Sequence, residues 1–160
     1  MTSKNFAMNM AAMLMPSTGS AVYPPRFNQK LDRLNSIVRC ASPAAALTAK
    51  QTMDTLRAPI LDSPLLSPLK WVETDTLPDI EPSGLMPTPK ENALAFLQYT
   101  SGSTSDPKGV MLSHGNLMAN LEAIKQCFGL SEESRGLVWL PPYHDMGLIG
   151  GVLEPAYVGF

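Results

Sequence analysis

LAFLQYTSGSTSDPKGVMLSHGNL, residues 94–117, contains a strand, a polar loop, a second strand and the start of a helix. The apolar runs at 94–99 and 109–112 predict two short strands on either side of the loop. Ser113 is a residue type that caps helices and Gly129 a type that ends them, so the residues between them predict a helix. Strands that alternate with helices over short connections indicate a layered α/β fold.

The polar loop at 100–108 carries groups that bind phosphate. It holds five serine or threonine hydroxyls and Gly102, and Lys108 followed by Gly109 forms its exit. Hydroxyls donate to phosphate oxygens, glycines let backbone N–H groups turn toward an anion, and lysine adds a positive charge. The loop differs from a Walker A loop, which opens directly into a helix after its lysine. A flexible linker is the alternative for this composition, whereas the flanking strands and Lys108 favour a polyphosphate cradle.

Upstream of this loop, the sequence predicts two helices and two strands. Apolar residues recur at helical spacing between positions 31 and 41, and Ser42-Pro43 stops that helix. The apolar run at 44–48 predicts a buried strand, and 50–56 predicts a second, short helix. Prolines then recur from position 59 to position 89, which predicts a long surface loop with a single strand at 69–74.

Downstream of the loop, apolar patterns predict buried elements. The helix after Ser113 carries an apolar stripe that we expect to be core, namely Leu117, Leu121, Ile124 and Phe128. The run at 136–140 predicts a strand of a parallel sheet, buried on both faces, and 146–160 predicts a buried helix. Gly147, Gly150 and Gly151 are expected to permit close packing there.

Two histidines lie near these elements, and each has a functional and a structural interpretation. His144 and Asp145 follow the predicted strand at 136–140, at the end of a strand where open α/β sheets bind ligands. They are therefore candidate substrate-lining residues, and the alternative is a histidine that ties down a loop with Asp145 as its partner. His114 lies in the first turn of a capped helix, where a structural role is favoured.

Composition excludes several classes of protein. The chain has 160 residues, of which 44% are hydrophobic and 16% charged, and its net charge is −2. This composition argues against disorder, the charge does not suggest a nucleic-acid binder, and no window approaches the apolar length of a membrane span. Cys40 and Cys127 are far apart and predict free thiols in a reducing compartment, the cytoplasm. Residues 1–20 predict an atypical leader, disordered or spurious, because Asn9 interrupts a pattern that only faintly resembles a signal peptide.

The loop, LQYTSGST at 97–104 followed by DPKGVM at 106–111, resembles the phosphate-loop signature of the acyl-adenylate-forming (AMP-binding) superfamily. Three further stretches resemble the long-chain fatty acyl-AMP ligase branch: YPPR at 23–26, SHGNL at 113–117, and WLP with YHDMGLIGGVL between 139 and 153. The resemblance covers about residues 21–160. It implies an incomplete layered sheet-and-helix subdomain of the large N-terminal domain, truncated at the C-terminus. Ser105 departs from the pattern, because the family usually has glycine there.

This resemblance implies an activity. ATP and a fatty acid give an acyl-adenylate and pyrophosphate, with Mg²⁺, and the acyl group then passes to an acyl carrier protein or polyketide synthase. Donors at the β- and γ-phosphates stabilise the leaving pyrophosphate. The residues that resemblance assigns to this role are Thr100, Ser101, Gly102, Ser103, Thr104 and Lys108. It places His144 and Asp145 beside the adenylate, and it assigns no certain catalytic residue and no metal ligand within these residues.

Two other interpretations stay open. The chain resembles, less closely, an acyl-CoA synthetase or a peptide-synthetase adenylation unit, and the YHDMGL stretch favours the fatty acyl-AMP ligase branch. It also fits a non-catalytic remnant, because the family's downstream adenine, ribose and hinge motifs and its small C-terminal domain have no counterpart before Phe160. We therefore expect the isolated chain to be inactive.

Overall fold

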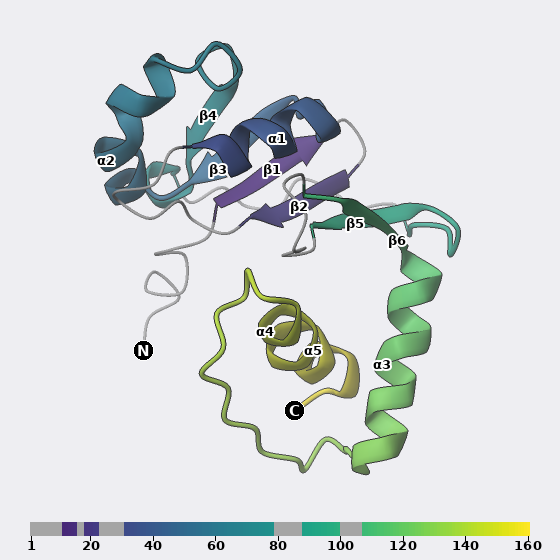
Figure 1. The fold of residues 1–160 in the computed structure, drawn as a ribbon. Helices are drawn as coiled ribbons and strands as arrows, with labels where there is room; N and C mark the ends of the chain where they lie inside the picture. Colours follow the sequence, from purple (N-terminus) through teal and green to yellow (C-terminus); the bar gives the residue numbers. More distant parts are fainter. Residues whose placement is uncertain (1–10, 16–17, 23–30, 79–87, 100–106) are drawn as a thin grey trace.

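A computed structural model describes residues 11–15, 18–22, 31–78, 88–99 and 107–160 (Figure 1). Within these residues, six strands form one mixed sheet in the order β4-β3-β1-β2-β5-β6. The strands are β1 (Ala11–Met15), β2 (Thr18–Val22), β3 (Ala45–Thr48), β4 (Lys70–Glu73), β5 (Leu94–Tyr99) and β6 (Gly109–Ser113). Parallel pairing joins β3 to β4 and β2 to β5, and the other neighbours are antiparallel.

The centre of this sheet differs from what the sequence predicts. β1 and β2 join β3 on one side to β5 on the other, so residues 11–15 and 18–20 of the expected leader are strands. β1 and β2 pair with each other as an antiparallel hairpin, from Ala11 opposite Val22 to Met15 opposite Thr18. The remainder of the expected leader lies outside the described residues.

Two helices and the sheet enclose the core. Helix α1 (Asp32–Ala41) has the predicted bounds and ends at Ser42, whose φ of 47° lies in the left-handed region. Its buried face meets that of helix α2 (Lys50–Leu61), and Leu66 and the strand residue Tyr99 complete the cluster. The core comprises Leu31, Leu34, Ile37, Val38, Leu56, Ile60, Leu66 and Tyr99. Trp71 of β4 and Leu97 of β5 pack against it, so the helices cover that part of the sheet.

Helix α2 is longer than the sequence predicts. It continues through Pro59, which lacks an N–H group and was expected to begin a loop. Ile60, one residue beyond that proline, is only 2% exposed, so burial of the last turn favours the helix despite the lost hydrogen bond. The predicted strand that follows is confirmed as β4, and a short 3-10 turn, η2 (Thr74–Thr76), comes after it.

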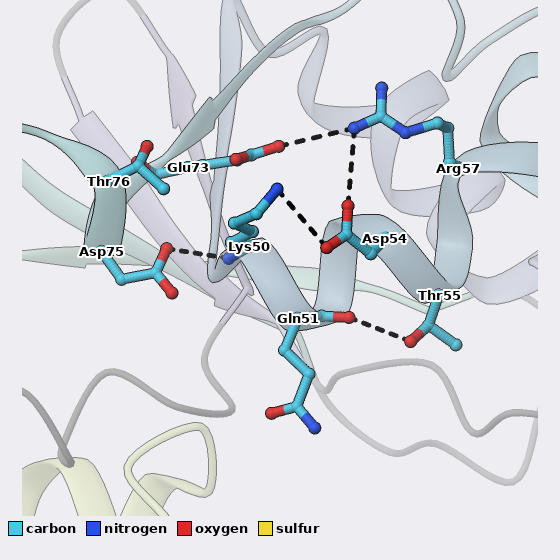
Figure 2. A network of polar contacts seen from close by, with 8 residues as sticks. All are labelled: Lys50, Gln51, Asp54, Thr55, Arg57, Glu73, Asp75 and Thr76. Atoms are coloured by element: carbon cyan, nitrogen blue, oxygen red, sulfur yellow. Dashed lines mark hydrogen bonds and ion pairs between the residues drawn. The ribbon is translucent and has the colours of Figure 1, made fainter.

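Exposed polar contacts join α2 to β4 and η2 (Figure 2). The backbone N–H of Lys50 donates to Oδ1 of Asp75 at 2.8 Å, which satisfies a donor in the first turn of the helix. Nη2 of Arg57 lies 3.7 Å from Oδ1 of Asp54 on the helix and 3.7 Å from Oε1 of Glu73 on the strand, and so connects the two elements. Exposed ion pairs stabilise a fold little, so this network orients α2 while the buried cluster holds it.

A second group of helices follows β6. Helix α3 (His114–Phe128) begins at the predicted cap, where Ser113 and Asn116 form a reciprocal capping box, and it ends at Gly129 with a φ of 62°. The chain later forms α4 (Asp145–Leu148), the π-helical turn η3 (Ile149–Leu153) and α5 (Glu154–Val158) without a break, which confirms the predicted helix. The predicted burial is wrong for most of it, because only Gly147, Glu154 and Val158 are buried between residues 146 and 160. Figure 1 shows this helical segment beside α3, away from the core under α1.

Two predictions in this region are wrong. Residues 136–140 form no strand, because no described strand lies alongside to pair with them, and Leu137 and Trp139 are 89% and 83% exposed. The stripe of α3 is also not all core: Leu121 is buried, whereas Phe128 is 76% exposed. Within the described part of the chain, no helix has the length and apolar character needed to cross a membrane.

We predict that the stability of the core depends strongly on Leu66. Leu66 is fully buried, so Leu66→Ala is expected to lower the free energy of unfolding by about 2–5 kcal/mol. Leu61 is 67% exposed, and Leu61→Ala is the matched control, expected to change that free energy by no more than about 0.5 kcal/mol. Urea denaturation measures both, and equal losses would contradict the placement of the core.

Candidate functional site

The candidate phosphate loop is the connection of an antiparallel hairpin. β5 and β6 pair from Leu94 opposite Ser113 to Tyr99 opposite Gly109, with an irregularity between Leu94 and Phe96. The two ends of the loop are therefore held opposite each other, about 4.5–5.5 Å apart at their Cα atoms. Thr100, Ser101, Gly102, Ser103 and Thr104, together with Ser105, lie outside the described residues.

Tyr99 and Gly109 form the base of the loop through a close contact. A Cβ atom at Gly109 would lie 3.0–3.2 Å from the Tyr99 ring carbon Cζ, its neighbour Cε1 and the hydroxyl oxygen, so only glycine fits there without displacing the ring. Tyr99 is 8% exposed. Burial, and then the neighbouring Cys40 side chain, raise the pKa of the Tyr99 phenol above its usual range. Tyr99 is thus an uncharged residue that closes the base of the loop.

Lys108 extends from the exit of the loop into solvent. It is exposed, and within the described residues no carboxylate lies within ion-pair distance of it. Its charge is therefore not neutralised by any carboxylate of the described residues. Because Gly109 follows it directly and is paired with Tyr99, the backbone of Lys108 is anchored on one side.

The second predicted pair, His144 and Asp145, forms the start of α4. Nδ1 of His144 lies 2.6 Å from Oδ1 of Asp145, and that oxygen also accepts from the backbone N–H of Met146 at 2.8 Å. Nδ1 also lies 3.3 Å from this N–H, but a lone pair on Nδ1 would face the carboxylate. The geometry therefore favours a proton on Nδ1 that is donated to Asp145. The pair caps the helix and remains partly exposed, with side chains 40% and 55% accessible.

Close packing of glycines positions this helix start. A Cβ atom at Gly147 would collide with the carbonyl oxygen of Pro141, and one at Gly151 would lie 2.8 Å from Cγ1 of Val138. These two glycines confirm the predicted close approach, whereas a Cβ at Gly150 would meet nothing within 4 Å. The irregular chain before His144 can thus lie directly against α4 and η3.

A cavity of about 460 Å³ lies between α3 and the α4–α5 segment. Its apolar wall includes Ile124 and Phe128 of the predicted stripe, which line this space instead of filling a core. Asp145 also lines it, so the structure brings one predicted site residue to this cavity, whereas Lys108 does not line it. His114 does not line the cavity. Its backbone N–H donates to the carbonyl oxygen of Ala93 at 3.0 Å, which is in keeping with a structural role.

Glu154 is the residue of this cavity that sequence reasoning missed. It is 1% exposed and lines the cavity, and its two carboxyl oxygens have no hydrogen-bond partner within the described residues. Burial and then the Glu122 carboxylate raise its pKa, while Lys125 opposes the shift. The available signal was a single charge in the otherwise uncharged run 146–160, where a carboxylate is unexpected.

A polar contact between α3 and α5 lies next to Glu154. The Tyr157 hydroxyl donates to Oε2 of Glu122 at 2.6 Å, and Nε2 of Gln126 donates to Oε1 of the same carboxylate at 2.8 Å. Both bonds, that from Tyr157 first, lower the pKa of Glu122. The Lys125 ammonium lies 5.9 Å from the centre of the Tyr157 ring. Two neighbouring carboxyls thus have pKa values shifted in opposite directions.

Comparison with known proteins places these features in a family. The model of the AMP-binding enzyme family matches residues 4–160. The chain is 36% identical over 138 residues to the medium-chain-fatty-acid–[acyl-carrier-protein] ligase JamA of Moorena producens, covering 85% of this chain and 23% of that protein. It is 34% identical over 136 residues to the long-chain-fatty-acid–AMP ligase FadD32 of Mycolicibacterium smegmatis, covering 84% and 22%.

A solved structure agrees with these matches. The fatty acyl-adenylate ligase from L. pneumophila, in complex with acyl adenylate and pyrophosphate, is 36% identical with a TM-score of 0.70, covering 87% of this chain and 24% of that one. The matches confirm the predicted resemblance to the fatty acyl-AMP ligase branch and the α/β subdomain. The chain spans about a quarter of the length of these relatives or less.

We predict that Gly109 is required for closure of the loop. Gly109→Ala is expected to lower the free energy of unfolding by about 1–3 kcal/mol, because the new methyl group displaces the Tyr99 ring. Gly150→Ala enters open space in a helical turn and is expected to be neutral or to stabilise by up to about 1 kcal/mol. Urea denaturation of both variants checks this, and a neutral Gly109→Ala would disprove the contact.

We also predict that Glu154 makes the free energy of unfolding fall as pH rises. Its pKa is raised above 4.5 in the folded state, so the folded chain binds more protons and stability falls as pH rises from 4.5 through the raised pKa. Glu154→Gln is expected to remove that decline, and Glu133→Gln, an exposed control, to keep it. Unfolding free energies measured from below pH 4.5 to neutral pH test the sign, and parallel curves for Glu154→Gln and the unaltered chain would refute it.

Proposed function

The chain belongs to the AMP-binding enzyme family, and from this premise we propose that it forms part of an enzyme that activates a fatty acid with ATP. The observation that carries the proposal is the β5–β6 hairpin, which joins a hydroxyl-rich loop to a lysine with no ionic partner within the described residues. The relatives named as fatty acid ligases support the substrate class. The compartment proposed is the cytoplasm.

The proposed chemistry is a displacement at the α-phosphorus of ATP. An oxygen of the fatty acid carboxylate forms a bond to that phosphorus, and the bond to the β-phosphate bridging oxygen breaks, which releases pyrophosphate. Negative charge grows on the pyrophosphate as it leaves, so donors around it stabilise the transition state. We assign this role to Thr100, Ser101, Gly102, Ser103, Thr104 and Lys108. The substrate is MgATP, because Mg²⁺ usually binds through substrate phosphates and keeps several waters.

His144 and Asp145 are proposed to line the site where the activated carboxyl lies. The substrate carboxylate is ionised, so no general base is required, and the pair is assigned a positioning role. Nδ1 of His144 lies 2.6 Å from Oδ1 of Asp145, so the carboxylate fixes the orientation of the imidazole ring. The partly exposed position of the pair at the start of α4 is compatible with contact to a ligand.

The second step of the proposed function transfers the acyl group to an acyl carrier protein or polyketide synthase. JamA is named as an acyl-carrier-protein ligase, which supports this acceptor. Transfer to coenzyme A at the rate of adenylation would instead assign the chain to an acyl-CoA synthetase. Since the chain spans about a quarter of its relatives or less, we propose that the 160 residues alone bind ATP weakly and give no pyrophosphate exchange above background.

We predict that Lys108 contributes to catalysis through the phosphates. In a protein that carries this chain together with the rest of an AMP-binding domain, Lys108→Ala is expected to slow ATP–pyrophosphate exchange about a hundredfold, the usual effect of removing one transition-state donor. Exchange with labelled pyrophosphate and a long-chain fatty acid measures the rate.

The matched control is Lys90→Ala, an exposed lysine just before β5 and outside the loop. Its exchange rate is expected to equal that of the unaltered protein. An unchanged rate in Lys108→Ala would remove Lys108 from the proposed phosphate site, and equal losses in both variants would point to net charge instead of position.

A further inference from the structure

Gly147 is the buried residue through which α4 packs against the chain that precedes it. A Cβ atom at Gly147 would collide with the carbonyl oxygen of Pro141. It would also lie 2.7 Å from the Pro141 carbonyl carbon and 2.9 Å from the carbonyl oxygen of Leu140. All three atoms belong to the backbone, which cannot rotate out of the way as a side chain can. The close approach of residues 140–141 to α4 therefore requires glycine at this position.

The carbonyl group of Pro141 that Gly147 contacts also holds the backbone of His144. The His144 N–H donates to the Pro141 carbonyl oxygen at 2.9 Å, and the His144 carbonyl oxygen accepts from the N–H of Leu148 at 2.8 Å. His144 is thus bonded to the preceding turn on one side and to the first turn of α4 on the other. A displacement of the Pro141 carbonyl would therefore change the position of His144.

The orientation of the His144 side chain depends on the same backbone. Nδ1 of His144 lies 2.6 Å from Oδ1 of Asp145, the first residue of α4. Asp145 thus sets the direction of the imidazole ring, while the bond to Pro141 sets the place of the backbone that carries it. Misplacement of a positioning group by about 1 Å costs enzymes about a hundredfold in rate. Packing at Gly147 can therefore affect a reaction that His144 helps to position.

Two neighbouring glycines show that this coupling is specific. A Cβ atom at Gly151 would lie 2.8 Å from Cγ1 of Val138, which is a side-chain atom. A Cβ atom at Gly150 would meet nothing within 4 Å, and Gly150 is exposed. Of these three glycines, Gly147 is the one that packs on a backbone group bonded to a candidate site residue.

We propose that Gly147 is a positioning residue for the activation of the fatty acid, and that it acts on His144 through the Pro141 carbonyl group. The inference rests on the proposed function, in which His144 and Asp145 line the site of the activated carboxyl. Gly147 contacts neither the fatty acid nor ATP in this account. Its role is to let the turn before α4 lie close enough to hold His144 in place.

Hydrogen exchange at the His144 amide tests the structural part of the inference in the 160-residue chain. Gly147→Ala is expected to speed this exchange about tenfold, because the new methyl group displaces the carbonyl oxygen that accepts from the amide. Gly150→Ala, in the same helical segment, is the matched control and is expected to leave the rate unchanged. Equal exchange rates at His144 in Gly147→Ala and the unaltered chain would overturn the inference.

A measurement on the unaltered chain avoids dependence on the folding of a variant. In the chain labelled with nitrogen-15 and carbon-13, a scalar coupling across the hydrogen bond is expected between the His144 amide nitrogen and the Pro141 carbonyl carbon. Absence of this coupling, when couplings within α3 are detected, would remove the link between Gly147 and His144 and overturn the inference.

Pyrophosphate exchange tests the functional part in a protein that carries this chain together with the rest of an AMP-binding domain. Gly147→Ala is expected to lower kcat/KM for the fatty acid about tenfold to a hundredfold and to leave the KM for ATP unchanged. The double variant with His144→Ala is expected to lose no more than His144→Ala alone, because Gly147 acts through His144. A merely structural role would instead give losses that multiply.

The outcomes separate this inference from the proposed function. Exchange in the unaltered longer protein together with multiplying losses, or with an equal rise in the KM for ATP, overturns the positioning role alone. Absence of exchange in that unaltered protein overturns the proposed function and, with it, the positioning role. Exchange with losses that do not multiply supports both.

Discussion

The pairing of Tyr99 with Gly109 is the constraint on which the candidate site depends. It closes the β5–β6 hairpin, so the two ends of the hydroxyl-rich loop meet across one ladder position. The Tyr99 ring lies over Gly109 and also belongs to the core cluster with residues of α1 and α2. The base of the loop is therefore attached to the most buried part of the described residues.

A second, less buried region depends on the same hairpin. β6 ends at Ser113, whose side chain caps α3, so the direction of the hairpin determines where α3 begins. The α4–α5 segment joins α3 through the bond from Tyr157 to Glu122, with Leu121 and Val158 the buried apolar residues there. This region leaves a cavity, an unpartnered acid and exposed apolar residues such as Trp139. Helices α1 and α2, by contrast, enclose the buried core.

Local signals made some of this fold predictable. Helices α1 and α3 and strands β3, β5 and β6 follow from periodicity, caps and turn residues, which act over a few neighbours. Sheet order does not follow from such signals, because β1 and β2 reach the centre of the sheet through long-range pairing. Residues 136–140 show the converse: strand propensity is present, but no described strand pairs with it. Helix α2 continues through Pro59 because its last turn buries Ile60, a tertiary effect that local signals do not report.

The candidate site, like the fold, could be predicted only in part from the sequence. The His144–Asp145 contact could be predicted because the two residues are adjacent in the sequence, whereas the cavity beside Glu154 arises from residues far apart in the chain. The most direct test of the central claim is a titration of the chain with magnesium pyrophosphate, followed through backbone amide NMR shifts. We predict shifts at Lys108, Gly109 and the loop between them and Tyr99, with none at α1 or α2. Shifts of equal size at exposed lysines and arginines elsewhere in the chain, or none at Lys108 and Gly109, would contradict it.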